Sequence, residues 1–408
     1  MLGPGLITGA SDDDPSGIST YAIAGASFGY GTLWMALVTL PMMSAVQYMC
    51  AKIGMVSGRG LAGVLKTHYP GKLLYLAVFG LVVANSINAG ADIGAIAAGI
   101  NLLVSVPVWT LIVPIALLIV ALQWWGSYQL IANLFKWLTI ALFAYVISGF
   151  LCRPDPIAVL RGTLIPSFPL KRNFLMLAVG ILGTTISPYM FFWQSNQEVE
   201  EEIAAGRRAL AQRRGATRAE LKYAAIDVNL GMLMSNMVMY FIILSTAATL
   251  FRAGKTDIQS AADAAQALRP FAGRAAEAFL AVGLIGTGFL AVPILTGSSA
   301  YAVAETLGWK YGLDKRPKGA RKFYWLILGS TLAGMLINFG GINPIKALFL
   351  TAVINGFLAP PLLLLIMKVA NDRRVMGSRV NGPLLNVAGW ATAAVMTAAA
   401  VGLVLSWL

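Results

Sequence analysis

Most of this chain consists of apolar runs about as long as a lipid bilayer is thick. A run of about 20 apolar residues can cross the hydrocarbon core of a membrane as a helix. The chain is 58% hydrophobic and only 12% charged, with a mean hydropathy of +0.74. A soluble domain carries roughly 25% charged residues, and a soluble protein of this composition would expose large apolar patches. The sequence therefore predicts an all-α integral membrane protein whose surroundings are a lipid bilayer.

The apolar runs predict eleven transmembrane helices in a single domain, 1–408. Their approximate bounds are 1–28, 31–56, 73–103, 105–124, 127–151, 172–203, 224–251, 273–306, 322–340, 344–369 and 383–408. The first five spans (about 1–151) and the next five (about 172–369) form two halves of equal helix number. The span 383–408 is then an extra helix.

Lysine and arginine predict the orientation of these spans. They are concentrated in four loops, 52–72, 204–222, 310–322 and 368–379. An even number of spans separates each of these loops from the next, so all four lie on one side of the membrane. Because basic loops stay in the cytoplasm, we expect a cytoplasmic N-terminus and an external C-terminus. The expected location is the plasma membrane, the inner membrane of a bacterium.

Composition also excludes several classes of function. The net charge of +13 fits basic cytoplasmic loops facing anionic lipids, and the basic runs lack the interleaved aromatics of a nucleic-acid surface. Cys50 and Cys152 adjoin apolar runs, so no disulfide framework is expected, and His68 alone cannot build a site of several imidazoles. No GxxxxGK[ST] loop occurs. We therefore expect no enzymatic activity, ATP-driven pumping, cofactor, nucleic acid or obligate protein partner.

The first apolar run is interrupted at its middle by acids and helix breakers. The acids are consecutive: Asp12, Asp13 and Asp14. Pro15 removes a backbone donor and Gly17 adds backbone freedom, so the helix should unwind at Asp14 and release carbonyls such as that of Ser11. Buried acids are tolerated in a membrane where they face a cavity or an ion. The alternative places the acids at the membrane surface, but it leaves the apolar run LGPGLITGA outside the bilayer.

The sixth apolar run carries a second interruption at its middle. It consists of Thr184, Thr185, Ser187 and Pro188. Proline and threonine kinks are common in membrane helices and are repaired by neighbours, so this break alone indicates little. Spans one and six, however, are the first helices of the two halves. Matching broken helices indicate a binding site at the midplane of a transporter, and a carboxylate with hydroxyls and carbonyls suits Mg²⁺ or Mn²⁺.

At these residues the chain resembles the Nramp family of divalent-metal transporters. The resemblance covers nearly the whole chain and includes GPG before the first break, Asp14-Pro15, Pro188 and the pattern ADIGAIAAGINLL in span three. It implies the LeuT-type fold, in which spans 1–5 and 6–10 are inverted repeats with helices 1 and 6 broken. It also implies a divalent metal ion as the transported substrate, moved by alternating access.

The chain departs from the family pattern at the expected metal ligands. Family members carry Asp-Pro-Gly-Asn at the first break, whereas Gly17 stands here in place of the asparagine. At the second break they carry Met-Pro-His, whereas this chain has Ser187 for the methionine and Tyr189 for the histidine, with Thr184 at a preceding alanine position. The metal-site candidates are Ser11, Asp14, Gly17, Thr184 and Ser187. Without a thioether, the site favours a hard, partly hydrated cation.

The residues linked to proton transport are altered as well. Asp92 aligns with one acid of span three, but Asn85 and Ala95 replace the others. These changes resemble the Nramp-related magnesium transporter branch, which carries Mg²⁺ and Mn²⁺ without evident proton coupling. The alternatives are a conventional proton-coupled Mn²⁺/Fe²⁺ symporter, a transporter of amino acids or other organic solutes on the same fold, and a channel. The pore or gating candidates are Asp12, Asp13, Asn85, Asp92, Tyr189, Thr351 and Asn355.

Overall fold

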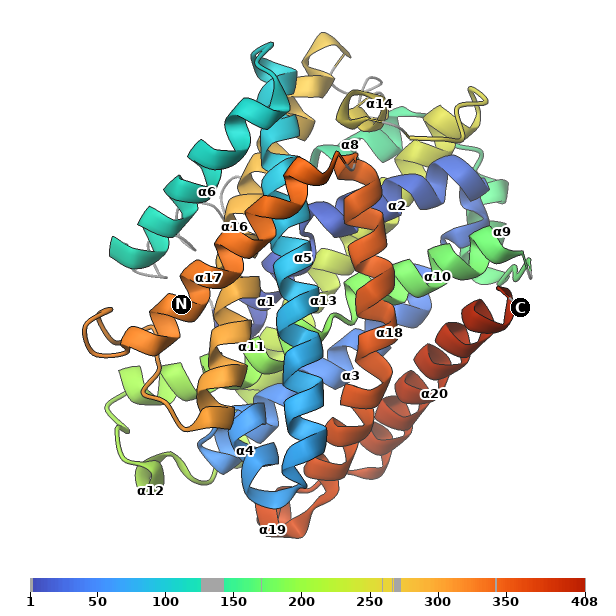
Figure 1. Cartoon of the computed structure of the whole chain (residues 1–408). Helices are drawn as coiled ribbons and strands as arrows, with labels where there is room; N and C mark the ends of the chain where they lie inside the picture. Colours follow the sequence, from blue (N-terminus) through green and yellow to red (C-terminus); the bar gives the residue numbers. More distant parts are fainter. Residues whose placement is uncertain are drawn as a thin grey trace.

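The computed structural model describes residues 3–125, 143–169, 171–258, 260–265, 267, 273–341 and 343–407. Within these ranges every regular element is a helix and no strand occurs (Figure 1). Nine helical stretches there are long and apolar enough to cross a membrane. They are α3 (Trp34–Ser57), α5 (Gly71–Leu103), α6 (Val108–Trp125), α10 with α11 (Arg172–Ala204), α13 with η3 (Arg218–Phe251), α16 (Ala276–Leu307), α17 with η6 (Arg321–Gly340), α18 (Pro344–Asn371) and α20 (Pro383–Leu405).

Two further predicted spans have a different outcome. The first is divided into α1 (Pro4–Asp12) and α2 (Pro15–Phe28), each too short to cross a membrane alone. Most of the predicted span 127–151 lies outside the described residues, and the described part forms α8 (Phe143–Leu151). The total of eleven spans therefore stays a prediction.

Short helices lie at the two ends of the molecule (Figure 1). At one end are α4 (Leu61–His68), α12 (Leu210–Arg213), and α19 with η7 (Arg373–Met376, Gly377–Arg379). Toward the other are α9 (Pro156–Leu164), α14 (Ala261–Ala265), η1 (Gly29–Thr32) and η5 (Gly273–Ala275). The loops that hold α4, α12 and α19 are three of the four basic loops. Their common end fits one shared side of the membrane.

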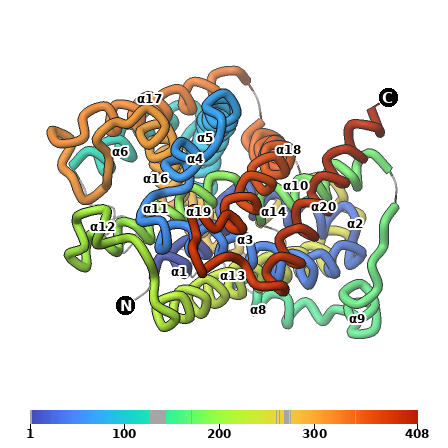
Figure 2. Tube along the Cα trace, turned by 90° about the horizontal axis from the view of Figure 1, so that it is seen from below, coloured from blue at the N-terminus to red at the C-terminus, as the bar shows by residue number. Residues whose placement is uncertain are grey.

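The broken helices lie at the centre, and the most lipid-like surfaces lie at the edges. Figures 1 and 2 place α6 and α17 at one edge and α20 at the opposite edge. Only 22% of the apolar stretch of α6 and 28% of that of α20 is buried, against 83% for α10 with α11. Apolar side chains such as Trp109, Leu117 and Val387 are exposed on these outer helices. Lipid contact accounts for such surfaces, since a soluble protein would bury them.

Half-helix α1 packs against α13 through glycines. A Cβ placed on Gly9 would lie 2.4 Å from the backbone of Gly231, and one on Gly5 would lie 2.6 Å from the backbone of Val228. Gly5 and Gly9 form the small-xxx-small spacing that lets membrane helices approach closely. The carboxylate of Asp227 in α13 then accepts hydrogen bonds from the amides of Gly3 (3.2 Å) and Gly5 (2.6 Å) at the start of α1.

Candidate functional site

The first helix break occurs where the sequence predicts it. Helix α1 ends at Asp12 and α2 begins at Pro15. Pro15 has no amide proton to donate to the carbonyl four residues earlier, which belongs to Ser11. The hydroxyl of Tyr189 takes this place and donates to the Ser11 carbonyl oxygen at 3.0 Å. Because Tyr189 belongs to α11, this bond joins the two broken helices.

The second break repeats this chemistry. Helix α10 ends at Thr185 and α11 begins at Pro188. Pro188 leaves the Thr184 carbonyl without its helical donor, and the Ser187 hydroxyl lies 2.9 Å from that oxygen and 2.6 Å from the carbonyl oxygen of Gly183. The hydroxyl of Ser187 thus repairs the end of α10. The structure shows no hydrogen bond from it to Asp14.

The Asp14 carboxylate caps α2 and reaches a neighbouring span. Its Oδ1 accepts hydrogen bonds from the Gly17 amide and the Ser16 hydroxyl, both at 2.7 Å. Its Oδ2 accepts one from Asn88 Nδ2 of α5 at 3.1 Å, and Asn88 Oδ1 accepts one from the Thr351 hydroxyl of α18 at 2.7 Å. A polar chain therefore runs from α18 through α5 to the first break.

The two preceding acids face another helix. Asp12 Oδ2 accepts a hydrogen bond from the Ser235 hydroxyl of α13 at 2.5 Å, and Asp13 Oδ1 lies 3.3 Å from the same hydroxyl. Asp12, Asp13 and Asp14 are at most 5% exposed. Among the described residues, no lysine or arginine forms an ion pair with any of them. Asp12 and Asp13 thus face α13 whereas Asp14 faces α5, and no basic side chain among the described residues pairs with any of the three.

Of the five metal-site candidates, all except Ser187 lie at the first break. The Thr184 hydroxyl lies 3.4 Å from the Ser16 hydroxyl. A Cβ placed on Gly17 would lie 3.2 Å from both the Thr184 hydroxyl oxygen and the Asp12 carbonyl oxygen. A side chain at position 17 would therefore press against the Thr184 hydroxyl of the second broken helix.

The pore candidates other than Asp12 and Asp13 divide into three groups. Thr351 and Tyr189 join the network of the first break, as described above. Asn85 turns to α16, where its Nδ2 donates to the Leu295 carbonyl (3.1 Å) and to the Ser299 hydroxyl (3.0 Å). Asp92 and Asn355 are almost fully buried, and no hydrogen-bond partner of their side chains lies among the described residues.

Three residues of the network were not among the candidates selected from the sequence: Ser16, Ser235 and Asn88. Ser16 lies inside the motif and was detectable as a residue that favours helix N-termini. Asn88 lies four residues before Asp92, which places both near one face of a helix. That spacing was a usable signal for Asn88. Nothing in the local sequence distinguishes Ser235 from other serines of membrane helices.

The donors at the first break are oxygens. Within the described part of the chain, no three His, Cys, Asp or Glu side chains converge as a metal cluster. The groups available as metal ligands are one carboxylate, the hydroxyls of Ser16 and Thr184, and the carbonyls at the ends of α1 and α10. The C-terminal end of a helix carries partial negative charge, so both half-helix ends favour a cation near Asp14. Such a donor set suits a hard divalent ion.

Known proteins are similar to this chain over a range that includes every residue of the site. The family model described as Nramp, natural resistance-associated macrophage protein-like, matches residues 5–406. The chain is 28% identical to the divalent metal cation transporter MntH of Bacillus subtilis (strain 168), covering 98% of this chain and 90% of that protein. It is 27% identical to the protein of the same name from Mycobacterium tuberculosis (strain H37Rv), with 97% and 89% covered.

Solved structures support the fold. The manganese transporter of Eremococcus coleocola superimposes with a TM-score of 0.78 at 18% identity, covering 98% of this chain and 85% of that one. Mhp1, a nucleobase-cation-symport-1 family transporter, gives a TM-score of 0.59 at 14% identity, with 100% and 93% covered. The expected LeuT-type fold is confirmed by these neighbours. At such low identity they indicate the architecture and not the substrate.

Proposed function

The chain belongs to the Nramp family, and we propose that it carries divalent metal cations across a membrane. The observation that carries the proposal is Asp14, a buried carboxylate at a helix break with two further buried acids beside it and no basic partner among the described residues. Burying an unpaired charge costs free energy, and a bound cation offsets that cost. The relatives named as divalent metal cation transporters support the same substrate class.

Mg²⁺ and Mn²⁺ are the proposed ions. Asp14 supplies the charged ligand, with the carbonyl of Ser11 and the hydroxyl of Thr184 as neutral oxygens. Ser187 has no sulfur to offer, and its hydroxyl is engaged by the carbonyls of α10. Mg²⁺ usually keeps several waters and binds through one or two carboxylates. A site with one carboxylate of this kind and small neighbours suits a partly hydrated ion.

The proposed mechanism is alternating access without strong proton coupling. Tyr189 replaces an imidazole, and a phenol does not gain or lose a proton near neutral pH. The second candidate is a proton-coupled Mn²⁺/Fe²⁺ symporter of the conventional kind. One observation favours it: Asp92 is a buried carboxylate with no hydrogen-bond partner among the described residues, a suitable place to carry a proton.

The proposed orientation has the N-terminus in the cytoplasm of a bacterial cell and the C-terminus outside. The grouping of α4, α12 and α19 at one end supports this orientation (Figure 1). Two inverted repeats, about 1–151 and 172–369, are proposed because α1/α2 and α10/α11 break at corresponding places.

Uptake into proteoliposomes tests the function. Wild-type protein should take up Mn²⁺, Mg²⁺ should compete, and Ca²⁺ should compete less because its larger shell needs more ligands. A pH gradient should change the rate little. Asp14→Ala should abolish uptake, whereas Asp314→Ala, at an exposed acid in the loop after α16, should behave as wild type. Full uptake by Asp14→Ala would refute the site, and uptake that requires the pH gradient would favour the symporter.

A further inference from the structure

Asn88 is the one side chain from outside the two broken helices that contacts Asp14 through a hydrogen bond among the described residues. It is fully buried in the middle of α5. Its amide is held at both ends, because Nδ2 donates to Asp14 Oδ2 at 3.1 Å and Oδ1 accepts from the Thr351 hydroxyl at 2.7 Å. In this arrangement the amide presents its donor to the carboxylate and its oxygen to Thr351.

The Thr351 hydroxyl has a second acceptor in reach. It lies 2.7 Å from the Leu348 carbonyl oxygen, the same distance as from Asn88 Oδ1. A hydroxyl has one proton to donate and two lone pairs to accept. When Thr351 donates to Leu348, its lone pairs can accept from Asn88 Nδ2. The amide can then turn by half a rotation and keep both of its ends hydrogen-bonded or ligated, with its carbonyl oxygen directed at the Asp14 carboxylate.

That turned state is unfavourable without a cation and favourable with one. Two oxygens facing each other at hydrogen-bond distance repel, because neither carries a proton. A divalent ion between them converts this repulsion into two metal–oxygen contacts, and amide oxygens are suitable ligands for hard cations. A bound ion would therefore favour the turned amide, and loss of the ion would favour the orientation that donates to Asp14.

We propose that Asn88 is an amide ligand of the transported cation, and that Thr351 permits the half rotation that exposes its oxygen. This inference rests on the proposed function and names a ligand for the same site. Gly17 offers no side chain, and the space around it admits none without a shift, since a Cβ would lie 3.2 Å from two oxygens. An amide from α5 reaches Asp14 from another side.

Paired substitutions separate a ligand from a mere donor. Asn88→Leu removes both amide atoms, whereas Asn88→Asp removes the donor and keeps an oxygen. If Asn88 is a ligand, Asn88→Leu should weaken Mn²⁺ binding by at least ~10-fold, and Asn88→Asp should bind Mn²⁺ at least as tightly as wild type. If Asn88 only donates to Asp14, Asn88→Asp should bind as poorly as Asn88→Leu, and that result would overturn the proposal.

Binding is measured on purified full-length protein by loss of the free Mn²⁺ signal in electron paramagnetic resonance, with Mg²⁺ as competitor. Thr351→Val keeps the shape and removes the hydroxyl, so it should also weaken Mn²⁺ binding, and wild-type affinity would overturn the rotation. Asn101→Ala, at an exposed asparagine of α5, is the control. Metal-free melting temperatures identify variants that fail to fold, and if Asn88→Leu does so, Asn88→Asp and Thr351→Val decide the question.

Asp14→Ala distinguishes failure of the proposed function from failure of the proposal that Asn88 is a ligand. Loss of binding in Asp14→Ala, together with wild-type affinity in Asn88→Leu, would reject Asn88 as a ligand and leave the proposed function standing. Wild-type affinity in Asp14→Ala would reject the site itself and the inference with it.

Discussion

At the residue scale, Pro15 and Pro188 determine which backbone carbonyls the two helix breaks release. Each proline leaves one carbonyl, four residues earlier, without its helical donor. The Ser11 carbonyl is taken by Tyr189, and the Thr184 carbonyl is approached by the Ser187 hydroxyl. Buried backbone groups are nearly always paired. Of these two carbonyls, the one on Ser11 depends on a distant side chain, so it is the more easily released to an ion.

Removing the Tyr189 hydroxyl tests this release. In Tyr189→Phe the Ser11 carbonyl loses its partner, and leaving a buried group unpaired costs about 1–3 kcal/mol. We expect a lower melting temperature without metal and a smaller difference from wild type in saturating Mn²⁺, because the ion then satisfies the carbonyl. Tyr145→Phe is the matched control, since the buried Tyr145 hydroxyl has no hydrogen-bond partner among the described residues. An equal loss with and without Mn²⁺ would contradict the prediction.

At the element scale, both helix breaks were predictable because their causes are local. Asp14 followed by Pro15, and Ser187 followed by Pro188, end one helix and begin another wherever the chain lies. The role of Ser187 was not predictable, since a hydroxyl at that position can repair the preceding helix or bind an ion. Sequence reasoning predicted binding, and the structure records hydrogen bonds to α10.

Contacts between distant elements were beyond the reach of the sequence. That Asn88 faces Asp14 while Asn85 faces α16 depends on the rotation of α5 about its axis and on its height beside α2. Both asparagines lie in an apolar helix, three residues apart. Periodicity indicates which residues share a face, but it does not indicate which neighbour that face meets.

The close packing of α1 against α13 can be tested by a single substitution. Gly9→Ala would place a methyl group 2.4 Å from the Gly231 backbone, so α1 must move away from α13. We expect a lower melting temperature and strongly reduced Mn²⁺ uptake, because α1 carries the Ser11 carbonyl. Gly329→Ala in α17 is the control, since nothing lies within 4 Å of its added methyl and alanine favours a helix. Equal Mn²⁺ uptake by both variants would contradict close packing of α1 against α13.

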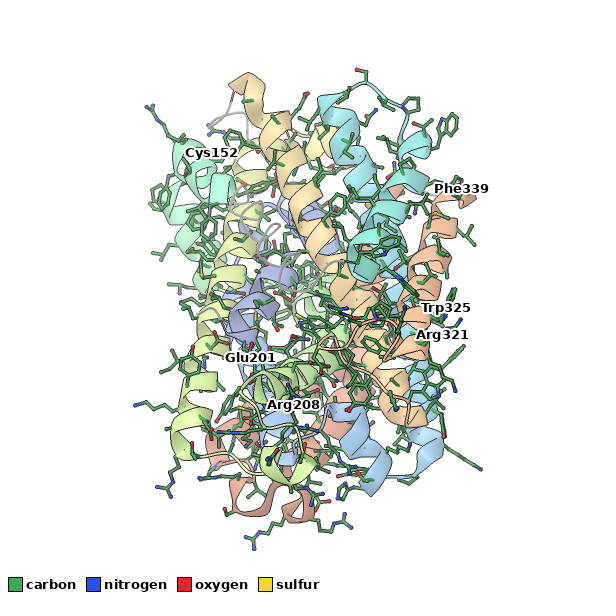
Figure 3. The ribbon with its side chains drawn as sticks, turned by 90° about the vertical axis from the view of Figure 1, so that its left-hand side faces the viewer. Cys152, Glu201, Arg208, Arg321, Trp325 and Phe339 are labelled. Carbon is green, nitrogen blue, oxygen red and sulfur yellow. The ribbon has the colours of Figure 1, made fainter. Side chains whose placement is uncertain are left out.

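At the scale of the whole molecule, Cys152 and Arg208 lie toward opposite ends (Figure 3). Cys152 follows α8 and is half-buried, whereas Cys50 is fully buried. In the proposed orientation, a membrane-impermeant thiol reagent should label Cys152 from outside the cell, and Ala211→Cys in α12 only after the membrane is opened. Cys152→Ser supplies the background. Labelling of the two sites from the reverse sides would invert the orientation.

The rate of this labelling should depend on pH. Burial raises the pKa of the Cys152 thiol above its ordinary value. The thiolate is the reactive form, so the fraction available for reaction is small at neutral pH. Labelling of Cys152 should therefore rise with pH at higher pH than labelling of the exposed Ala211→Cys thiol, and coinciding pH profiles would contradict a pKa raised by partial burial.

The unbalanced acids at the first break have an electrical consequence. Among the described residues no lysine or arginine forms an ion pair with Asp14, so a bound divalent ion displaces no basic side chain and adds its full charge to the carrier. In the proposed cycle the loaded and empty carriers differ by two elementary charges. Each charge is worth about 2.3 kcal/mol per 100 mV, so at 100 mV the two charges contribute about 4.6 kcal/mol, which corresponds to roughly two-thousandfold accumulation. In that cycle the membrane potential alone drives accumulation of the ion in the cell, with no proton gradient.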